Sequence, residues 1–159
     1  MKRSYLKRKT PLKRGGRLRV VGHSPAAEIK REIQRILRLL VIKRDGGCIL
    51  RDYPQTGVCG GYAKNGELIY QAEHLHTRSN AASFACLDLV VCLCQRHHIY
   101  YKPQHADEYY QIVKKHIGEK RSKLLKAVQE DRKAHKIDWK LQLFGLQLKL
   151  EDYEKNTDN

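Results

Sequence analysis

The sequence lacks any hydrophobic run long enough to cross a bilayer. Its N-terminus is basic but lacks the apolar core of a signal peptide. We therefore expect an intracellular, cytoplasmic protein with no membrane partner. The cysteine count is 5, an odd number, and in a reducing compartment paired cysteines favour a metal site over disulfides.

Acidic residues are absent before Glu28, although the chain as a whole contains 17 Asp+Glu. These stand against 32 Lys+Arg, which gives a formal net charge of +15. Lysine and arginine bind phosphates and release the counterions that surround a polyanion. The uneven positive charge therefore predicts a nucleic-acid partner, and we expect DNA, either double-stranded or branched.

Residues 1–24 contain few apolar side chains, and Pro11, Gly15 and Gly16 interrupt any helix. This composition predicts a flexible basic arm that settles on phosphates when nucleic acid binds. A nonspecific solubility tail is the alternative. The residues expected to contact phosphates are Lys7, Arg8, Lys9, Lys13, Arg14, Arg17 and Arg19.

Residues 25–153 are expected to form one domain, because a chain of 159 residues is hardly long enough for two. Its first element is a predicted helix over 25–42. Ser24 is the expected N-cap, and Pro25 suits the first helical position. The buried side of this helix is predicted from an apolar stripe, namely Ile29, Ile33, Ile36, Leu37 and Leu40.

Turn signals interrupt the segment after this helix, with two glycines directly before Cys48 and an Asn-Gly pair at 65–66. Residues 67–76 begin with β-prone side chains and are expected to form a strand. Together with the segment 43–61, this strand predicts a β-hairpin.

The C-terminal third reads mainly as helix. One helix is expected over 107–117, ended by Gly118, and another over 119–135. Apolar residues over 138–153 fit both a helical stripe and strand alternation. We favour a helix capped by Asp138.

Two pairs of soft or borderline ligands predict a tetrahedral structural zinc site formed by Cys48, Cys59, Cys94 and His97. The C-x-x-H spacing of the second pair suits a tight metal-binding turn, whereas the ten-residue spacer of the first pair is less specific. Cys86 and Cys92 compete for a ligand position. The alternative is that the cysteines are small buried apolar residues.

The ligand pairs enclose Glu73 and His74, and the run VVCLCQRHH ends at His98. This order resembles the HNH nuclease family. Within the family, AEHLHTRSN followed by VVCLCQRHH resembles small phage recombination-associated proteins of the NinG and Rap kind. The resemblance implies an α+β fold with a zinc-stabilised ββα-metal core over about 43–102, a preceding helix, and a helical extension over 103–153.

The resemblance further implies a metal-dependent endonuclease that hydrolyses DNA phosphodiester bonds in the cytoplasm of a phage-infected bacterium. His74 would be the general base, because a neutral imidazole can accept a proton from water near pH 7. Glu73 and His98 would hold the catalytic ion, Mg²⁺ or Mn²⁺. Arg78 could contact the scissile phosphate, and Lys102 could contact the DNA backbone.

The assignment of Glu73 and His74 to one active site requires a particular backbone geometry. Neighbours on a regular strand point to opposite faces of the sheet. Glu73 and His74 can therefore share a site only if the strand ends, bends or bulges between them. We expect such a bend, and His76 is the rival active-site histidine.

The sequence departs from the family pattern at Leu89, where members usually carry an asparagine that orients the base. Asp88 or Asn80 could substitute from a neighbouring position. The departure makes a zinc-stabilised DNA-binding protein with weak or lost catalysis the alternative function. A protein that acts on RNA is a third hypothesis, because charge alone does not distinguish the two polyanions.

Overall fold

The structure is a computed structural model that describes residues 24–77, 81–131 and 136–157. The predicted basic arm, with its seven phosphate-contacting residues, lies outside the described residues. Arg78 and Asn80 lie outside them as well.

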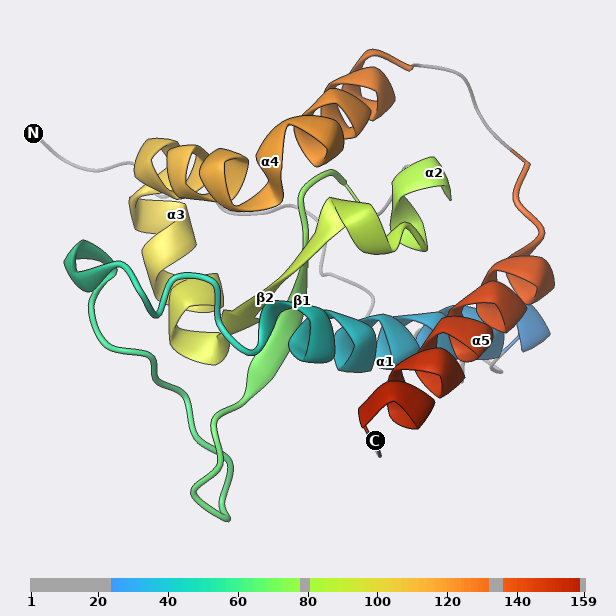
Figure 1. The fold of residues 1–159 in the computed structure, drawn as a ribbon, viewed down its shortest axis with the longest axis horizontal. Helices are drawn as coiled ribbons and strands as arrows, with labels where there is room; N and C mark the ends of the chain where they lie inside the picture. The colour runs from blue at the N-terminus through green and yellow to red at the C-terminus, as the bar shows by residue number, and fades with distance from the viewer. Residues whose placement is uncertain (1–23, 78–80, 132–135, 158–159) are drawn as a thin grey trace, which may run out of the picture.

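The fold is mixed α+β, with a two-stranded antiparallel sheet surrounded by helices. Figure 1 shows the sheet between α1 and α4, with α5 lying across α1. Among the described residues, no helix combines the length and the apolar composition needed to cross a bilayer. In chain order the elements are α1 (Pro25–Asp45), η1 (Pro54–Thr56), β1 (Tyr70–His74), α2 (Ala81–Phe84), η2 (Leu87–Leu89), β2 (Val90–Cys94), η3 (His97–Tyr101), α3 (Lys102–Gln104), α4 (Ala106–Glu130) and α5 (Trp139–Thr157).

Helix α1 begins as the sequence predicts. The Ser24 hydroxyl accepts a hydrogen bond from the Ala27 backbone N–H at 3.3 Å, and Pro25 is the first helical residue. The helix continues three residues beyond the predicted end and stops at Gly46, whose φ of 64° is a left-handed conformation suited to glycine. Four of the five predicted stripe residues are buried, and Val41 joins them; the buried set is Ile33, Ile36, Leu37, Leu40 and Val41.

The hairpin differs in part from the prediction. The Asn-Gly turn at 65–66 forms as expected, and an antiparallel bridge joins Tyr62 to Leu68 across it. Strand β1 pairs with β2, so that Tyr70 lies opposite Cys94 and His74 lies opposite Val90. The segment 43–61 contributes no strand and consists of the helix end, turns and loop. The physical reason is that every residue of β2 is buried, which suits an inner strand, whereas glycines and Pro54 break up the earlier segment.

The two faces of the hairpin are covered by different helices. Val91 and Leu93 belong to a buried cluster with Tyr109 and other residues of α4. Val90 and Cys92 pack against Val41 of α1 on the opposite face. This alternation decides which helix each side chain of β1 meets.

Helix α4 is bent at Gly118, whose φ of 72° and ψ of −178° are not helical. The predicted end of the first C-terminal helix at this glycine is therefore confirmed, and a second helical segment follows directly. That segment ends at Glu130, five residues before its predicted end.

The ambiguous segment 138–153 is helical, as favoured. The Asp138 Oδ1 atom accepts hydrogen bonds from the backbone N–H groups of Lys140 and Leu141 at 3.0 and 3.2 Å, which caps α5. Helix α5 packs its apolar stripe against α1, and Leu146 in this stripe is buried. Burial of that stripe outweighs the unfavourable helix propensity of Gly145.

A buried carboxylate joins α1, β2 and α4. The Asp45 side chain is 2% exposed and pairs with Arg44 at 2.7 Å and with His116 at 3.7 Å. It also accepts a hydrogen bond from the Cys92 backbone N–H at 2.8 Å. Burial by itself would raise the pKa of Asp45, but hydrogen bonds from His116 and Arg44 outweigh burial and lower the pKa to about 2.

The lowered pKa of Asp45 predicts a measurable dependence of stability on pH. The usual aspartate pKa in an unfolded chain is about 3.9, so the folded state gains about 2 kcal/mol above that pH and loses it as pH falls towards about 2. Asp45→Asn should reduce the free energy of unfolding at neutral pH by at least this amount. The difference between the two proteins should shrink below about pH 4, measured by urea denaturation. A difference that is independent of pH would contradict the prediction.

Candidate metal centre and candidate active site

Four side chains converge on one buried point. The Nδ1 atom of His97 lies 3.3 Å from the Cys48 and Cys94 sulfurs and 3.8 Å from the Cys59 sulfur. All four potential ligand atoms lie within 4.8 Å of one another. These are the four ligands that the sequence predicted, and together they could hold a metal ion.

Turns on both sides of the centre bring its cysteines into place. Cys48 follows the glycine turn that ends α1, and the next residue, Ile49, donates its backbone N–H to the Cys92 carbonyl at 3.0 Å. Cys59 is followed by two glycines that pack against the turn after β2. A Cβ on Gly61 would lie 2.5 Å from the Gln95 side chain, so only glycine fits this approach.

The orientation of His97 suits a metal ligand. The His97 ring is fully buried, and its Nε2–H donates to the Thr56 carbonyl at 3.1 Å. That bond places the hydrogen on Nε2 and leaves the Nδ1 lone pair directed at the three sulfurs. Burial also lowers the pKa of His97, which favours the neutral ring that a metal requires.

The thiols of the cluster need a positive charge if they are to ionise. Burial raises the pKa of the Cys48 thiol well above its ordinary range and also raises the pKa of the Cys59 thiol. A divalent cation supplies the missing charge and deprotonates coordinating thiols. The donor set therefore fits a metal with a preference for sulfur and imidazole.

The competing cysteines lie elsewhere. Cys92 is fully buried beside Val41 and Val90, on the face of the hairpin that α1 covers. Cys86 lies between α2 and η2 and is not part of the cluster. Both serve as controls for the metal centre.

We expect one divalent metal ion per chain in protein purified without added metal, measured by elemental analysis. Cys94→Ser should lose the ion and reduce the free energy of unfolding by several kcal/mol, because binding energy at such a site is folding energy. Cys86→Ser should keep a full equivalent. Folded wild-type protein with far less than one equivalent would contradict the assignment.

A second polar cluster surrounds Glu73, whose side chain is 5% exposed. The His98 Nε2 atom lies 2.7 Å from Glu73 Oε2, and the Lys102 ammonium contacts Oε1. Burial by itself would raise the pKa of Glu73, but the contacts with His98 and Lys102 outweigh burial and hold this pKa below its usual range. Glu73 therefore carries a negative charge that two neighbours share.

Two buried atoms near this carboxylate lack a hydrogen-bond partner among the described residues. They are Nδ1 of His98 and the hydroxyl of Tyr109. Glu73 and His98 also present a carboxylate and an imidazole, which are donors that divalent cations accept. Unpaired buried polar atoms are costly, and they are expected where a ligand completes a site. The pair therefore fits a hard or borderline cation.

His74 lies on the other face of the hairpin. Its Nε2 is 3.2 Å from the Phe84 carbonyl, and Gln34 Nε2 donates to the same carbonyl at 3.3 Å. A carbonyl oxygen only accepts, so the His74 contact places a hydrogen on Nε2 and the lone pair on Nδ1. The Gln34 amide lies 3.5 Å from the same ring nitrogen.

The expected bend between Glu73 and His74 is absent. Pairing with Val91 and Val90 continues in register through both residues, so the two side chains point to opposite faces as in a regular strand. Glu73 meets His98, whereas His74 meets α1 and the Phe84 carbonyl.

Leu89, the residue that departs from the resembled motif, lies in an apolar environment. Leu89 is fully buried, and its carbonyl accepts a hydrogen bond from the Leu75 backbone N–H at 2.9 Å. Asp88 is exposed, and its carbonyl accepts from Arg121. Sequence reasoning missed Gln34, which contacts His74 from α1. The feature of the sequence that could have pointed to Gln34 is a neutral polar side chain next to the apolar stripe of the predicted helix.

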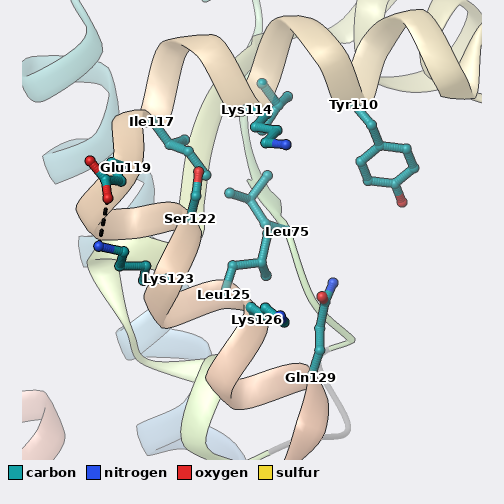
Figure 2. Close-up of a pocket in the computed structure, with 11 residues that line it drawn as sticks. Leu75, Tyr110, Lys114, Ile117, Glu119, Ser122, Lys123, Leu125, Lys126 and Gln129 are labelled. Atoms are coloured by element: carbon teal, nitrogen blue, oxygen red, sulfur yellow. Dashed lines mark ion pairs between the residues drawn. The ribbon is translucent and has the colours of Figure 1, made fainter.

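An apolar groove of about 420 Å³ lies next to these clusters, inside the bend of α4. Figure 2 shows Leu75, which directly follows His74, between the two halves of the helix. Lysines lie around the groove, and Lys123 pairs with Glu119 one turn earlier on the same half of the helix. The groove offers apolar contact rather than acid–base chemistry.

Comparisons with models of protein families, with curated proteins and with solved structures found no match for this chain. A functional assignment therefore rests on the motifs in the sequence and on the geometry of the two clusters. The geometry brings the four predicted sulfur and imidazole ligands together and joins Glu73 to His98. It places His74 on the opposite face of the hairpin.

Proposed function

We propose that this protein is a metal-dependent endonuclease of the HNH type that hydrolyses DNA phosphodiester bonds. The observation that carries the proposal is the 2.7 Å contact between Glu73 and His98. These residues are 25 positions apart in the sequence, and the motif resemblance pairs them as the ligands of a catalytic ion. The amino-acid composition of the chain does not account for a contact between these two residues.

The cluster of Cys48, Cys59, Cys94 and His97 is proposed to hold structural zinc. Four protein ligands close a tetrahedral shell and leave no position for substrate. Bound zinc would fix the loop that carries Cys59 to the end of β2. Since His98 directly follows a ligand, the zinc would also hold His98 against Glu73.

Glu73 and His98 are proposed to hold the catalytic ion, Mg²⁺ or Mn²⁺. A mixed carboxylate and imidazole pair suits Mn²⁺ somewhat better, because Mg²⁺ prefers oxygen. When bound, such an ion stabilises negative charge on the phosphate and on the leaving oxygen. Lys102 contacts the same carboxylate, so it competes with the ion for Glu73 and contributes positive charge near the phosphate.

His74 is proposed to be the general base. The Phe84 carbonyl accepts from Nε2–H and the Gln34 amide packs beside the same nitrogen, so the ring is held in one orientation, and a neutral imidazole can accept a proton from water. Together they supply the orienting contact for which the HNH family usually uses an asparagine. His74 and Glu73 are consecutive at the end of β1, and we propose that the phosphate binds over this strand end.

Two observations favour the alternative of a DNA-binding protein with weak or lost catalysis. Leu89 is apolar and buried, and the proposed base and metal ligands lie on opposite faces of β1. An RNA substrate is a further alternative. Supercoiled plasmid and a structured RNA, each incubated with Mg²⁺, Mn²⁺ or EDTA, separate the three hypotheses, since only an endonuclease on DNA nicks the plasmid.

We predict that His74→Ala reduces metal-dependent plasmid nicking by about a hundredfold or more, because the base that activates water is removed. His98→Ala should also impair nicking, but a higher Mn²⁺ concentration should partly restore it. His76→Ala is the matched control and should have a mild effect. Zinc content and DNA binding should stay close to wild type in all three variants.

Other outcomes would change the assignment. An inactive His76→Ala with an active His74→Ala would make His76 the base. Wild-type protein that fails to cleave with any of the divalent ions, combined with a Leu89→Asn variant that does cleave, would support the binding-protein alternative.

We also predict that the basic arm binds phosphates without reading sequence. It carries nine Lys+Arg within residues 1–19. Deleting these residues should weaken binding to unrelated DNA sequences by similar factors and should reduce the slope of log K against log salt concentration. Fluorescence anisotropy over a salt series measures both. An unchanged slope would make the arm a solubility tail.

A further inference from the structure

Helix α5 has a second apolar face that the described part of the chain leaves uncovered. Its first face packs on α1. On the other side, Leu141, Phe144 and Leu148 are 65%, 56% and 44% exposed. Their spacing of three and four residues places them on one side of the helix. Single exposed apolar side chains are ordinary, but three that are neighbours on one helix face form a patch.

Gly145 lies beside this patch, and neither the packing nor the backbone conformation of the described chain requires a glycine there. A Cβ at this position would meet nothing within 4 Å, and its φ is not in the left-handed region. Glycine inside a helix is less favourable than alanine, so its presence here weakens α5. A small residue on an apolar face does allow a side chain from another helix to approach closely.

We propose that α5 pairs in an antiparallel manner with α5 of a second copy of this chain. A two-fold axis between Phe144 and Gly145 places each Leu141 opposite Leu148 of the other copy. The same axis places each Phe144 level with Gly145 of the other copy, where the absence of a side chain leaves room beside the aromatic ring. The exposed apolar side chains and the glycine are thus complementary to themselves, which identifies a second copy as the partner.

Charges beside the patch support the same arrangement. Lys140 and Glu151 are both exposed, and neither has an ion pair among the described residues. They are eleven residues apart, about three helical turns, so they lie on the same flank of α5. Antiparallel pairing brings each Lys140 near Glu151 of the other copy. Parallel pairing would instead hold Lys140 about 16 Å from Glu151 of the other copy along the helix axis.

Sedimentation velocity over a series of protein concentrations tests the inference. The sample is the full chain, freed of nucleic acid and with its metal retained. The wild type should dimerise reversibly. Leu141→Glu and Phe144→Glu should each raise the dimer dissociation constant at least about tenfold, because each buries a charge in the apolar interface. Val58→Glu is the control, since Val58 is 75% exposed in a distant loop, and it should dimerise like wild type. Circular dichroism should show all three folded.

Charge exchange tests the antiparallel orientation. Lys140→Glu and Glu151→Lys should each weaken the dimer, and the double variant should restore it, because the cross-pairs re-form with reversed sign. Gly145→Gln should weaken the dimer while it raises the melting temperature of the monomer, whereas a role limited to the monomer predicts only the second effect.

Three outcomes would overturn the proposal. They are a wild type that stays monomeric throughout, a dimer that resists both Leu141→Glu and Phe144→Glu, and a double charge exchange that is weaker than either single change. None of these measurements depends on cleavage of DNA, so the dimer and the proposed nuclease activity can fail separately.

Discussion

The convergence of three cysteines and one histidine is the constraint on which the rest of the structure depends. Cys48 follows the end of α1, Cys59 lies in a loop of glycines, and Cys94 and His97 bracket the turn after β2. The loop from 46 to 69 has almost no regular structure. Without a shared cation, burial keeps the thiols of this loop protonated. A bound metal would deprotonate them and would provide the contact that fixes the loop against the hairpin.

The hairpin imposes a second constraint, because its pairing continues in register through Glu73 and His74. The two faces of β1 therefore lie in different environments. The face towards α4 carries a charged carboxylate between His98 and Lys102, and the face towards α1 carries the His74 imidazole in contact with a carbonyl. The separation suits the chemistry proposed for each, since a cation needs negative charge beside it and a base needs an unprotonated ring. It also means that the substrate has to reach both from the end of the strand.

Local signals in the sequence predicted much of this fold. Ser24 and Asp138 cap helices, and Gly118 interrupts one, because each effect depends on neighbouring residues alone. The types of the four side chains predicted the metal cluster, because thiols and imidazoles are metal ligands, although its members lie up to 49 positions apart. The Asn-Gly turn at 65–66 was also predicted, but the pairing of β1 with β2 was not, since the choice of β2 as partner depends on burial from both sides by α1 and α4. Gln34 was missed because its contact with His74 spans forty positions and leaves no pattern in either segment.

Long-range contacts of His74 explain how a leucine can occupy position 89. An asparagine at this buried position would need hydrogen-bond partners for its amide, and the apolar surroundings of β2 offer few. The polar contact with His74 comes instead from Gln34 on α1 and from the Phe84 carbonyl. If His74 acts as proposed, α1 is then part of the active site and not only of the core. Because α5 packs along the same helix, pairing of two α5 helices would connect the two copies through the element that orients each base.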